Sequence, residues 1–89
     1  MNLSELKTQL RSGEVRVIFK KKNGDTRIML CTLAENIIGQ EYQKEVMSGK
    51  KSNPDVLPVW DVEKKGWRSF RLDSIVKVVD GDTTHAYRG

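Results

Sequence analysis

The stretch GWRSFRLDSIVKV, residues 66–78, places two arginines and two aromatic side chains within five consecutive positions: Trp67, Arg68, Phe70 and Arg71. A guanidinium group can hold a phosphate or a carboxylate through two parallel hydrogen bonds, and an indole ring can stack on a nucleic-acid base. The same arginines also have three carboxylates close by in the sequence, those of Asp61, Glu63 and Asp73. The cluster is therefore either a surface that binds a polyanion or a set of ion pairs that hold a hairpin together.

A second basic group lies in EVRVIFKKKNGDTRIMLCTL, residues 14–33. Asn23-Gly24 between two β-rich runs is the strongest short-range signal for a hairpin, because a type I′ turn needs positive φ at both central residues. A two-residue turn there predicts that Lys20 lies directly opposite Arg27, and like charges in that position destabilise a hairpin. A bound phosphate, a nearby carboxylate or solvent screening would each relieve the repulsion.

The same register predicts which side chains of this hairpin form the core. It pairs Phe19 with Ile28, Val17 with Leu30 and Val15 with Thr32 on one apolar face. Ahead of the hairpin, three leucines at i, i+3 and i+7 spacing predict a short amphipathic helix over residues 3–11, with Asn2 or Ser4 as its N-cap and Gly13 just past its end. We expect this helix to cover one end of a sheet.

A second hairpin is predicted in residues 56–79. A three-residue loop of Lys64-Lys65-Gly66, with Gly66 in the left-handed conformation, pairs Trp60 with Phe70, Pro58 with Leu72 and Val62 with Arg68. A two-residue turn would instead put Trp60 opposite Arg71 and mix polar with apolar side chains on both faces, so the first register is preferred. It places Trp60 and Phe70 in the core and Trp67 on the opposite face.

The remaining segments complete one small domain over residues 1–79. In the insertion at 34–55, apolar residues at i, i+4 and i+8 predict a helix over roughly 38–47 that ends near Gly49. A tight turn at residues 72–74 sends a fifth strand, residues 75–79, back across the sheet. The polar stretch 80–89 is expected to be a flexible C-terminal tail.

Composition narrows the classes of protein to which the chain can belong. Its 89 residues carry a net charge of +4, and the positive excess falls on the two predicted hairpins, which favours a polyanionic partner. No apolar run approaches the roughly 20 residues of a membrane helix, and a lone cysteine, Cys31, suits a reducing cytosol. No metal-ligand spacing, phosphate loop or cofactor motif stands out, and the lone histidine, His85, lies in the polar tail. We therefore expect neither an enzyme nor a cofactor.

The stretches FKKKNGDTRIMLCTL and VWDVEKKGWRSFRLDSI resemble the WYL-like short proteins of tailed bacteriophages. The resemblance covers residues 14–33 and 59–78, and its second half is the more specific. That half is also similar to the F-R-L-D-R-I segment of the larger WYL domains of bacterial regulators, which implies an Sm-like barrel and nucleic-acid or nucleotide ligands. The chain departs from the larger family at Ser74, where an arginine would stand, and it lacks their helix-turn-helix domain.

Together these observations predict a mainly β fold, a small five-stranded Sm-like or SH3-like barrel with an N-terminal helix and a short helix in the insertion. The leading hypothesis is a phage-encoded module that binds nucleic acid or a nucleotide through a basic face, in the cytoplasm of the host bacterium. Its candidate site residues are Lys20, Arg27, Trp67, Arg68 and Arg71. A protein-interaction factor that modulates a host protein is the alternative, and a homo-oligomeric ring is a third possibility.

Overall fold

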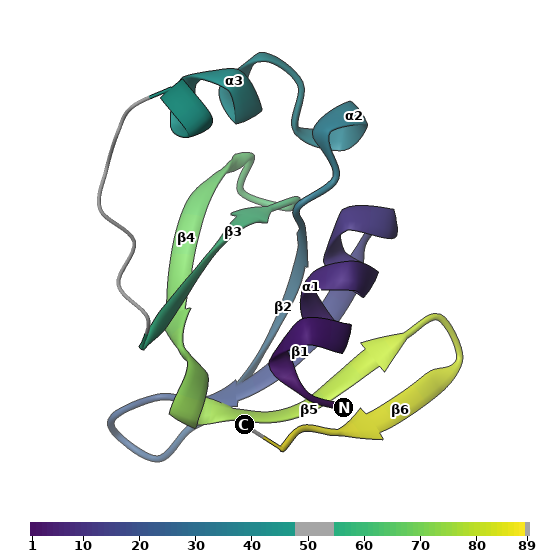
Figure 1. The fold of residues 1–89 in the computed structure, drawn as a ribbon. Helices are drawn as coiled ribbons and strands as arrows, with labels where there is room; N and C mark the ends of the chain where they lie inside the picture. The colour runs from purple at the N-terminus through teal and green to yellow at the C-terminus, as the bar shows by residue number, and fades with distance from the viewer. Residues whose placement is uncertain (48–54, 89) are drawn as a thin grey trace.

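The computed structural model describes residues 1–47 and 55–88, which form one six-stranded antiparallel sheet with helices at its margins (Figure 1). In chain order the elements are α1 (Leu3–Ser12), β1 (Val15–Lys20), β2 (Thr26–Thr32), α2 (Glu35–Ile38), α3 (Gln40–Met47), β3 (Val56–Asp61), β4 (Gly66–Arg71), the 3-10 helix η1 (Leu72–Ser74), β5 (Ile75–Asp80) and β6 (Thr83–Ala86). The strand order across the sheet is β4-β3-β2-β1-β5-β6. The expected mainly β fold is confirmed, with six strands rather than five.

The sheet curls around its core. Phe19 in β1 stacks on Phe70 in β4, with ring centroids 5.7 Å apart and planes 18° from parallel, although two strands separate β1 from β4 in the sheet order. Figure 1 accordingly shows β3 and β4 on the left of the core and β1 and β2 on its right. The buried cluster between them comprises Leu6, Leu10, Val15, Val17, Cys31, Leu57, Val59, Phe70, Ile75 and Val78.

Helix α1 contributes two leucines to this core and is tied to β2 by hydrogen bonds. Its N-terminus is capped by Asn2, whose side-chain oxygen accepts from the N–H of Glu5 at 2.9 Å, because the first N–H groups of a helix lack partners of their own. Leu6 and Leu10 are fully buried. The hydroxyl of Thr32 donates to the carbonyl oxygen of Leu10 at 3.0 Å. The predicted helix and its Asn2 cap are confirmed.

The turn of the first hairpin differs from the predicted type I′ turn. Among the described residues other than glycine, only Lys65 has a positive φ, so Asn23 does not adopt the predicted conformation. Its side-chain oxygen accepts from the N–H of Asp25 at 3.1 Å, and Lys21 N–H donates to the carbonyl of Asp25 at 2.8 Å. The loop therefore has three residues, with Gly24 left-handed at φ 91°, because the asparagine side chain forms a local turn of its own.

This turn shifts the register by one residue. Phe19 faces Arg27 and Lys20 faces Thr26, so the predicted Lys20–Arg27 repulsion is wrong. In β2 the side chains of Met29 and Cys31 point inward, and their partners in β1 are Val17 and Val15. Ile28, predicted to lie in the core, is instead 65% exposed on the other face, as expected when strand pairing slips by a single position.

The second hairpin also differs from both predicted registers. Trp60 pairs with Trp67 and Leu57 with Phe70, and the left-handed residue of the turn is Lys65, at φ 53°, rather than Gly66. The cause is Asp61: its carboxylate accepts from the N–H groups of Glu63 and Lys64, both at 3.0 Å, which starts the turn at Asp61. Trp60 and Phe70 are nevertheless buried, as expected.

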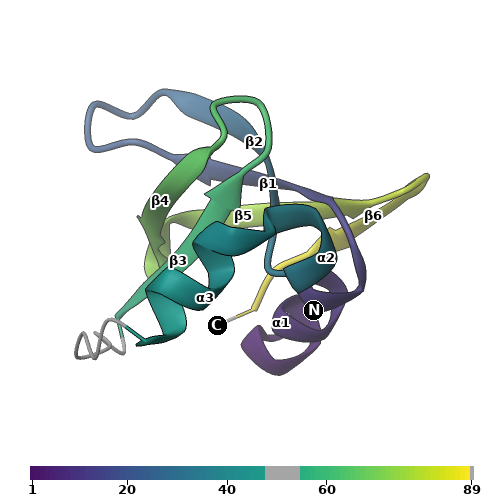
Figure 2. The same cartoon turned by 90° about the horizontal axis from the view of Figure 1, so that it is seen from above.

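The predicted flexible tail is wrong, because residues 83–86 form β6 against β5. Gly81, at φ 60°, lets the chain reverse directly after β5. The N-terminal ammonium of Met1 donates to the carbonyl of Ala86 at 2.7 Å, and the N–H of Arg88 donates to the carbonyl of Met1 at 2.8 Å. Figures 1 and 2 show β5 and β6 projecting together from the curled part of the sheet.

In place of one helix over 38–47, the insertion holds two, α2 and α3, which join at Gly39 with a φ of 76°. The predicted end near Gly49 lies outside the described residues. Within residues 1–47 and 55–88, no helix is both long and apolar enough to cross a membrane.

Cys31 is a core side chain. It is fully buried and its Sγ lies 3.6 Å from the carbonyl oxygen of Val15. Burial, assisted by the negative charge of Asp61, raises the pKa of Cys31 from 9.0 to about 12, because a thiolate loses its hydration inside an apolar core. A thiol protonated throughout the neutral range is a poor nucleophile.

Replacing Lys65 by glycine should stabilise the protein. A side chain in the left-handed region costs about 1 kcal/mol, which glycine does not incur. The free energy of unfolding, measured by urea denaturation, should therefore rise by up to about that amount in Lys65→Gly. Lys64→Gly is the matched control: it should be neutral or destabilising, since Lys64 has no positive φ. Equal effects of the two substitutions would contradict the assigned turn.

The buried thiol also predicts how stability depends on pH. Above about pH 9 the unfolded chain loses the thiol proton while the folded chain keeps it, so the folded state loses up to about 1.4 kcal/mol of stability per pH unit from this group. The free energy of unfolding of wild type and of Cys31→Ala can be measured by denaturant unfolding at about pH 8 and about pH 10. Between these two pH values it should fall less in the variant than in wild type. Identical falls would show that Cys31 is not protected from ionisation in the folded state.

Candidate ligand pocket

A pocket opens where β2 leaves β3. The two strands pair only at Cys31–Asp61 and Thr32–Trp60, and one further hydrogen bond, from the N–H of Val62 to the carbonyl of Leu30 at 3.0 Å, extends the contact. Beyond Leu30, toward its N-terminal end, β2 pairs with β1 alone. The space between this part of β2 and the β3–β4 hairpin is a pocket of about 480 Å³, lined by Phe19, Lys21, Arg27, Ile28, Met29, Leu30, Asp61, Glu63, Lys64, Arg68 and Ser69.

Cationic side chains predominate around this pocket. Lys21, Arg27, Lys64 and Arg68 all line it and are all exposed. None of the four side chains takes part in an ion pair or side-chain hydrogen bond within the described part of the chain. They come from the two hairpins, which face each other across the cavity. The pocket therefore carries a positive charge that the chain itself leaves unpaired.

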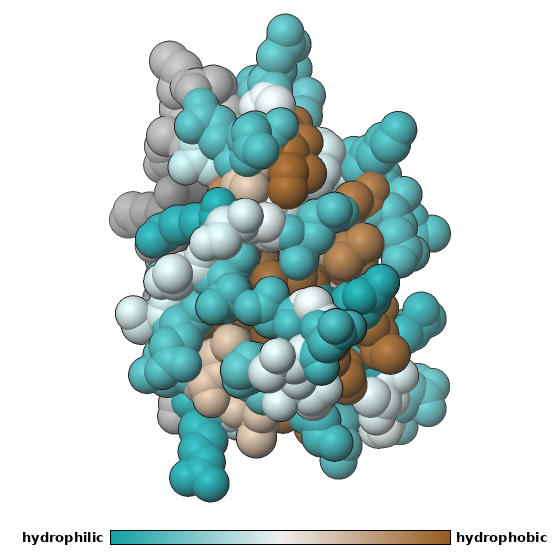
Figure 3. Space-filling model, turned by 90° about the vertical axis from the view of Figure 1, so that its right-hand side faces the viewer, coloured by the Kyte–Doolittle hydropathy of each residue, from teal (hydrophilic) through white to brown (hydrophobic). Residues whose placement is uncertain are grey.

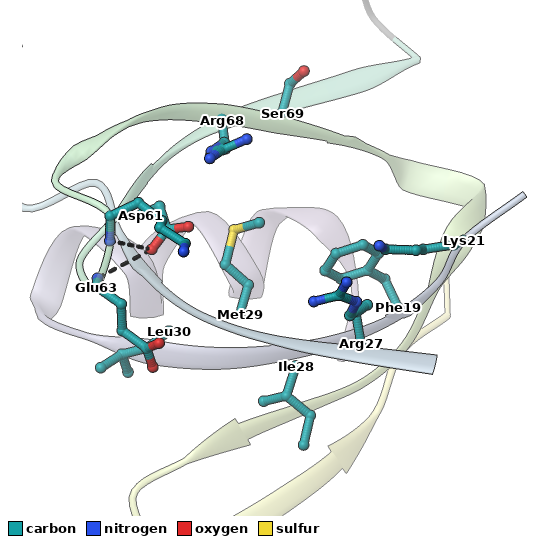
Figure 4. Close-up of a pocket in the computed structure, with 11 residues that line it drawn as sticks. Phe19, Lys21, Arg27, Ile28, Met29, Leu30, Asp61, Glu63, Arg68 and Ser69 are labelled. Atoms are coloured by element: carbon teal, nitrogen blue, oxygen red, sulfur yellow. Dashed lines mark hydrogen bonds between the residues drawn. The ribbon is translucent and has the colours of Figure 1, made fainter. Parts of the chain in front are cut away.

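The two carboxylates of the pocket play different parts. Asp61 is buried. Its carboxylate accepts hydrogen bonds from two N–H groups, and both belong to the turn of its own hairpin (Figure 4). It therefore holds the wall of the pocket in shape. Glu63 is exposed, so it is the one solvent-accessible acid among the described residues that line the pocket. The four cations outnumber it.

The floor of the pocket is apolar. Figure 4 shows Met29 and Arg68 pointing into the space between β2 and β4, with Phe19 beside Arg27 at the far end. Phe19 and Met29 are half-buried and pack against the core. A ligand with a flat apolar part and an anionic part would meet surfaces of both kinds here.

The edge of β2 adds backbone hydrogen-bonding groups. Along an antiparallel strand the N–H and C=O of every second residue point to the same side. Because the carbonyl of Leu30 points to Val62, the N–H and C=O of Ile28 also point to that side, into the pocket. They have no partner strand there, and the Ile28 side chain points away from the cavity (Figure 4). A ligand can therefore hydrogen-bond to both groups.

Two of the five predicted site residues, Arg27 and Arg68, come together at this pocket. The alternation of β4 explains why Arg68 does so: it shares the inward face with Phe70, while Trp67 and Arg71 point to the other face. The predicted ion pairs of Arg68 with Asp61 or Glu63 are absent within the described residues.

The other three predicted residues lie elsewhere. Lys20 faces Thr26 on the outer side of the sheet. Trp67 packs edge-on against Trp60, with centroids 5.7 Å apart and planes at 82°, and it is half-buried. Arg71 forms an ion pair with Asp73 at 3.2 Å. This is one of the ion pairs that the sequence offered as the alternative to a binding surface. None of the three lines the pocket.

Sequence reasoning did not include Lys21, Lys64 and Glu63 among the candidate site residues, although all three line the pocket. Asn23 and Asp61 are the sequence signals that could have indicated these residues, since asparagine and aspartate side chains commonly start turns. Turns that begin at Asn23 and Asp61 predict the observed registers. In these registers Lys20 lies on the outer side of the sheet and Lys21 lines the pocket.

Neither the cysteine nor the histidine of the chain is among the residues that line the pocket. Cys31 lies in the core, and His85 is half-buried on β6. No group of three or more histidine, cysteine, aspartate or glutamate side chains in residues 1–47 and 55–88 is arranged to hold a metal ion.

Comparison with known proteins agrees with this fold. Residues 3–76 match the family model described as WYL_2, Sm-like SH3 beta-barrel fold. The chain is also 36% identical over 74 residues to an uncharacterized 11.5 kDa protein in the Gp31-cd intergenic region of Enterobacteria phage T4, an alignment that covers 82% of this chain and 72% of the phage protein. No solved structure matches. The curled sheet, its strand order and this match together place the chain in the WYL_2 family of Sm-like SH3 β-barrels.

Proposed function

We propose that the protein is a small binding module that holds a phosphate-bearing ligand, a nucleic acid or a nucleotide, in the pocket between β2 and the β3–β4 hairpin. The observation that carries this proposal is the convergence of four unpaired cationic side chains, from two hairpins, on one open cavity.

The two arginines are the principal phosphate contacts. A guanidinium group matches two phosphate oxygens at once, and a hydrogen bond between charged partners contributes about 1.5–3 kcal/mol. Arg27 and Arg68 come from strands, β2 and β4, which hold the two side chains more rigidly than loops would. Lys21 and Lys64 lie beside the hairpin turns and add charge without fixed geometry.

The rest of the pocket suits the other part of a nucleotide. Phe19 and Met29 offer an apolar surface for a base. The N–H and C=O of Ile28 are a donor and an acceptor, their nitrogen and oxygen three bonds apart, that lie along one edge, and base edges also present donors and acceptors side by side. The pocket volume of about 480 Å³ lies within the range for small-molecule sites.

The test is a binding titration with fluorescently labelled single-stranded and duplex oligonucleotides and with cyclic dinucleotides, at low and at moderate salt. We expect binding at low salt that weakens steeply as salt is added, since each neutralised phosphate releases a counterion. Arg27→Gln and Arg68→Gln should each weaken binding by roughly tenfold or more.

Arg71→Gln is the matched control. It removes the same kind of charge, three residues from Arg68, from a side chain that pairs with Asp73 outside the pocket. The affinity of this variant for the oligonucleotides and cyclic dinucleotides should stay within about twofold of wild type. The exposed Arg71–Asp73 ion pair contributes little to stability and lies outside the pocket. The proposal fails if none of the ligands binds at low salt, or if Arg71→Gln weakens binding as much as Arg68→Gln.

A further inference from the structure

The outer face of the sheet is a second surface of distinct character. It is the face opposite the core, and its members are fixed by alternation from the buried residues of each strand. Over β1, β2, β5 and β6, the part considered below, it comprises Arg16, Ile18 and Lys20 in β1, Thr26, Ile28 and Leu30 in β2, Lys77 and Val79 in β5, and Thr84 and Ala86 in β6.

Four aliphatic side chains on this outer face lie outside the core. Ile18 and Ile28 are direct cross-strand partners, and Ile28 is 65% exposed, the most exposed large apolar side chain of the described residues. Leu30 and Val79 lie on either side of Arg16, as its partners in β2 and β5. None of the four belongs to the core cluster or packs against it. The side of the molecule drawn in Figure 3 shows hydrophobic residues that reach the surface between hydrophilic ones.

The charge on the outer face has one sign. Arg16, Lys20 and Lys77 are exposed, and the face carries no aspartate or glutamate. Arg16 and Lys77 are interleaved with the aliphatic side chains: Arg16 lies between Leu30 and Val79, and Lys77 is the partner of Ile18 in β5. Any occupant must therefore cover apolar groups and also meet two cations within the same area.

This combination selects the class of partner. A second copy of the chain would bring like charges together, which costs affinity. A nucleic acid would satisfy the cations but would leave the aliphatic groups without a matching surface. No aromatic side chain on which a base could stack lies among the outer-face residues of β1, β2, β5 and β6. The two outer-face tryptophans belong to the β3–β4 hairpin, where Trp60 is buried and Trp67 packs edge-on against it. A protein segment with an apolar row flanked by carboxylates matches both features.

We infer that the outer face is a docking surface for an acidic amphipathic helix of a partner protein. The apolar row of that helix packs on Ile18, Ile28, Leu30 and Val79, and its glutamates or aspartates meet Arg16 and Lys77. Ile28 and Leu30 also border the pocket, at the edge of β2, but their side chains lie on the side of the sheet away from the pocket floor. The inference therefore does not depend on the proposed phosphate ligand.

The test uses the full chain and three synthetic helical peptides with one common leucine row and with glutamate, glutamine or lysine at the flanking positions. Binding is followed by NMR shifts of the isoleucine, leucine and methionine methyl groups. We expect the glutamate peptide to shift the signals of Ile18 and Ile28 and to bind roughly five- to tenfold more tightly than the glutamine peptide.

Charge reversal gives the sharper readout. Arg16→Glu combined with Lys77→Glu should abolish the preference for the glutamate peptide and create one for the lysine peptide, which loss of folding could not produce. Ile28→Thr, which keeps a β-branched strand residue, should weaken the binding of all three peptides. Arg68→Gln, in the pocket, should leave peptide binding unchanged.

Several results would overturn the inference. One is that the three peptides bind to wild type equally well. Another is that the peptides shift the methyl signal of Met29, in the pocket floor, and leave that of Ile18 unchanged. The assigned partner class is also wrong if light scattering shows a dimer that Ile28→Thr dissociates, or if an oligonucleotide rather than the glutamate peptide shifts the outer-face signals.

Discussion

The structure depends on two rungs of backbone pairing, Cys31–Asp61 and Thr32–Trp60, which alone pair β2 with β3. The hydroxyl of Thr32 also lies 2.7 Å from the carbonyl oxygen of Gly13, so the end of α1 is fastened at the same place. Because the two hairpins are joined over so short a length, the sheet can curl on one side of the joint and must open on the other. The curled side closes on the core and the open side forms the pocket.

This arrangement gives the two sides of β2 different tasks. On its inner side, Met29 and Arg27 face the cavity opposite the cation of β4. On its outer side, Ile28 and Leu30 meet solvent beside Arg16. The positive charge of the two hairpins is thus divided between a concave site suited to phosphate and a convex face suited to an acidic protein. If both proposals hold, the protein binds a small ligand and a macromolecular partner on two different surfaces.

The sequence predicted the elements well and their registers poorly. Apolar periodicity was sufficient for α1 and for the core position of Phe70, because the hydrophobic effect acts on whole faces. Trp60 is buried as well, but on the opposite face of the hairpin, against Trp67 rather than Phe70. The registers were decided by two side chains, Asn23 and Asp61, which bond to their own turns and override the pattern of the strands. Arg27 and Arg68 line the pocket as candidate residues that the sequence also indicated, whereas Lys21 and Lys64 enter the pocket lining through the turns that Asn23 and Asp61 form. The strand β6 was missed because long-range bonds, such as the one from Met1 to Ala86, leave no local signal.

The open edge of β2 is the central claim of this account, and amide hydrogen exchange of the native protein tests it most directly. The N–H of Met29 belongs to the ladder with β1, whereas that of Ile28 points into the pocket without a partner strand. We predict that the Ile28 amide exchanges orders of magnitude faster than the Met29 amide under conditions where the protein remains folded. Equal protection of the two amides would mean that β2 is paired on both sides and that the pocket does not exist in solution.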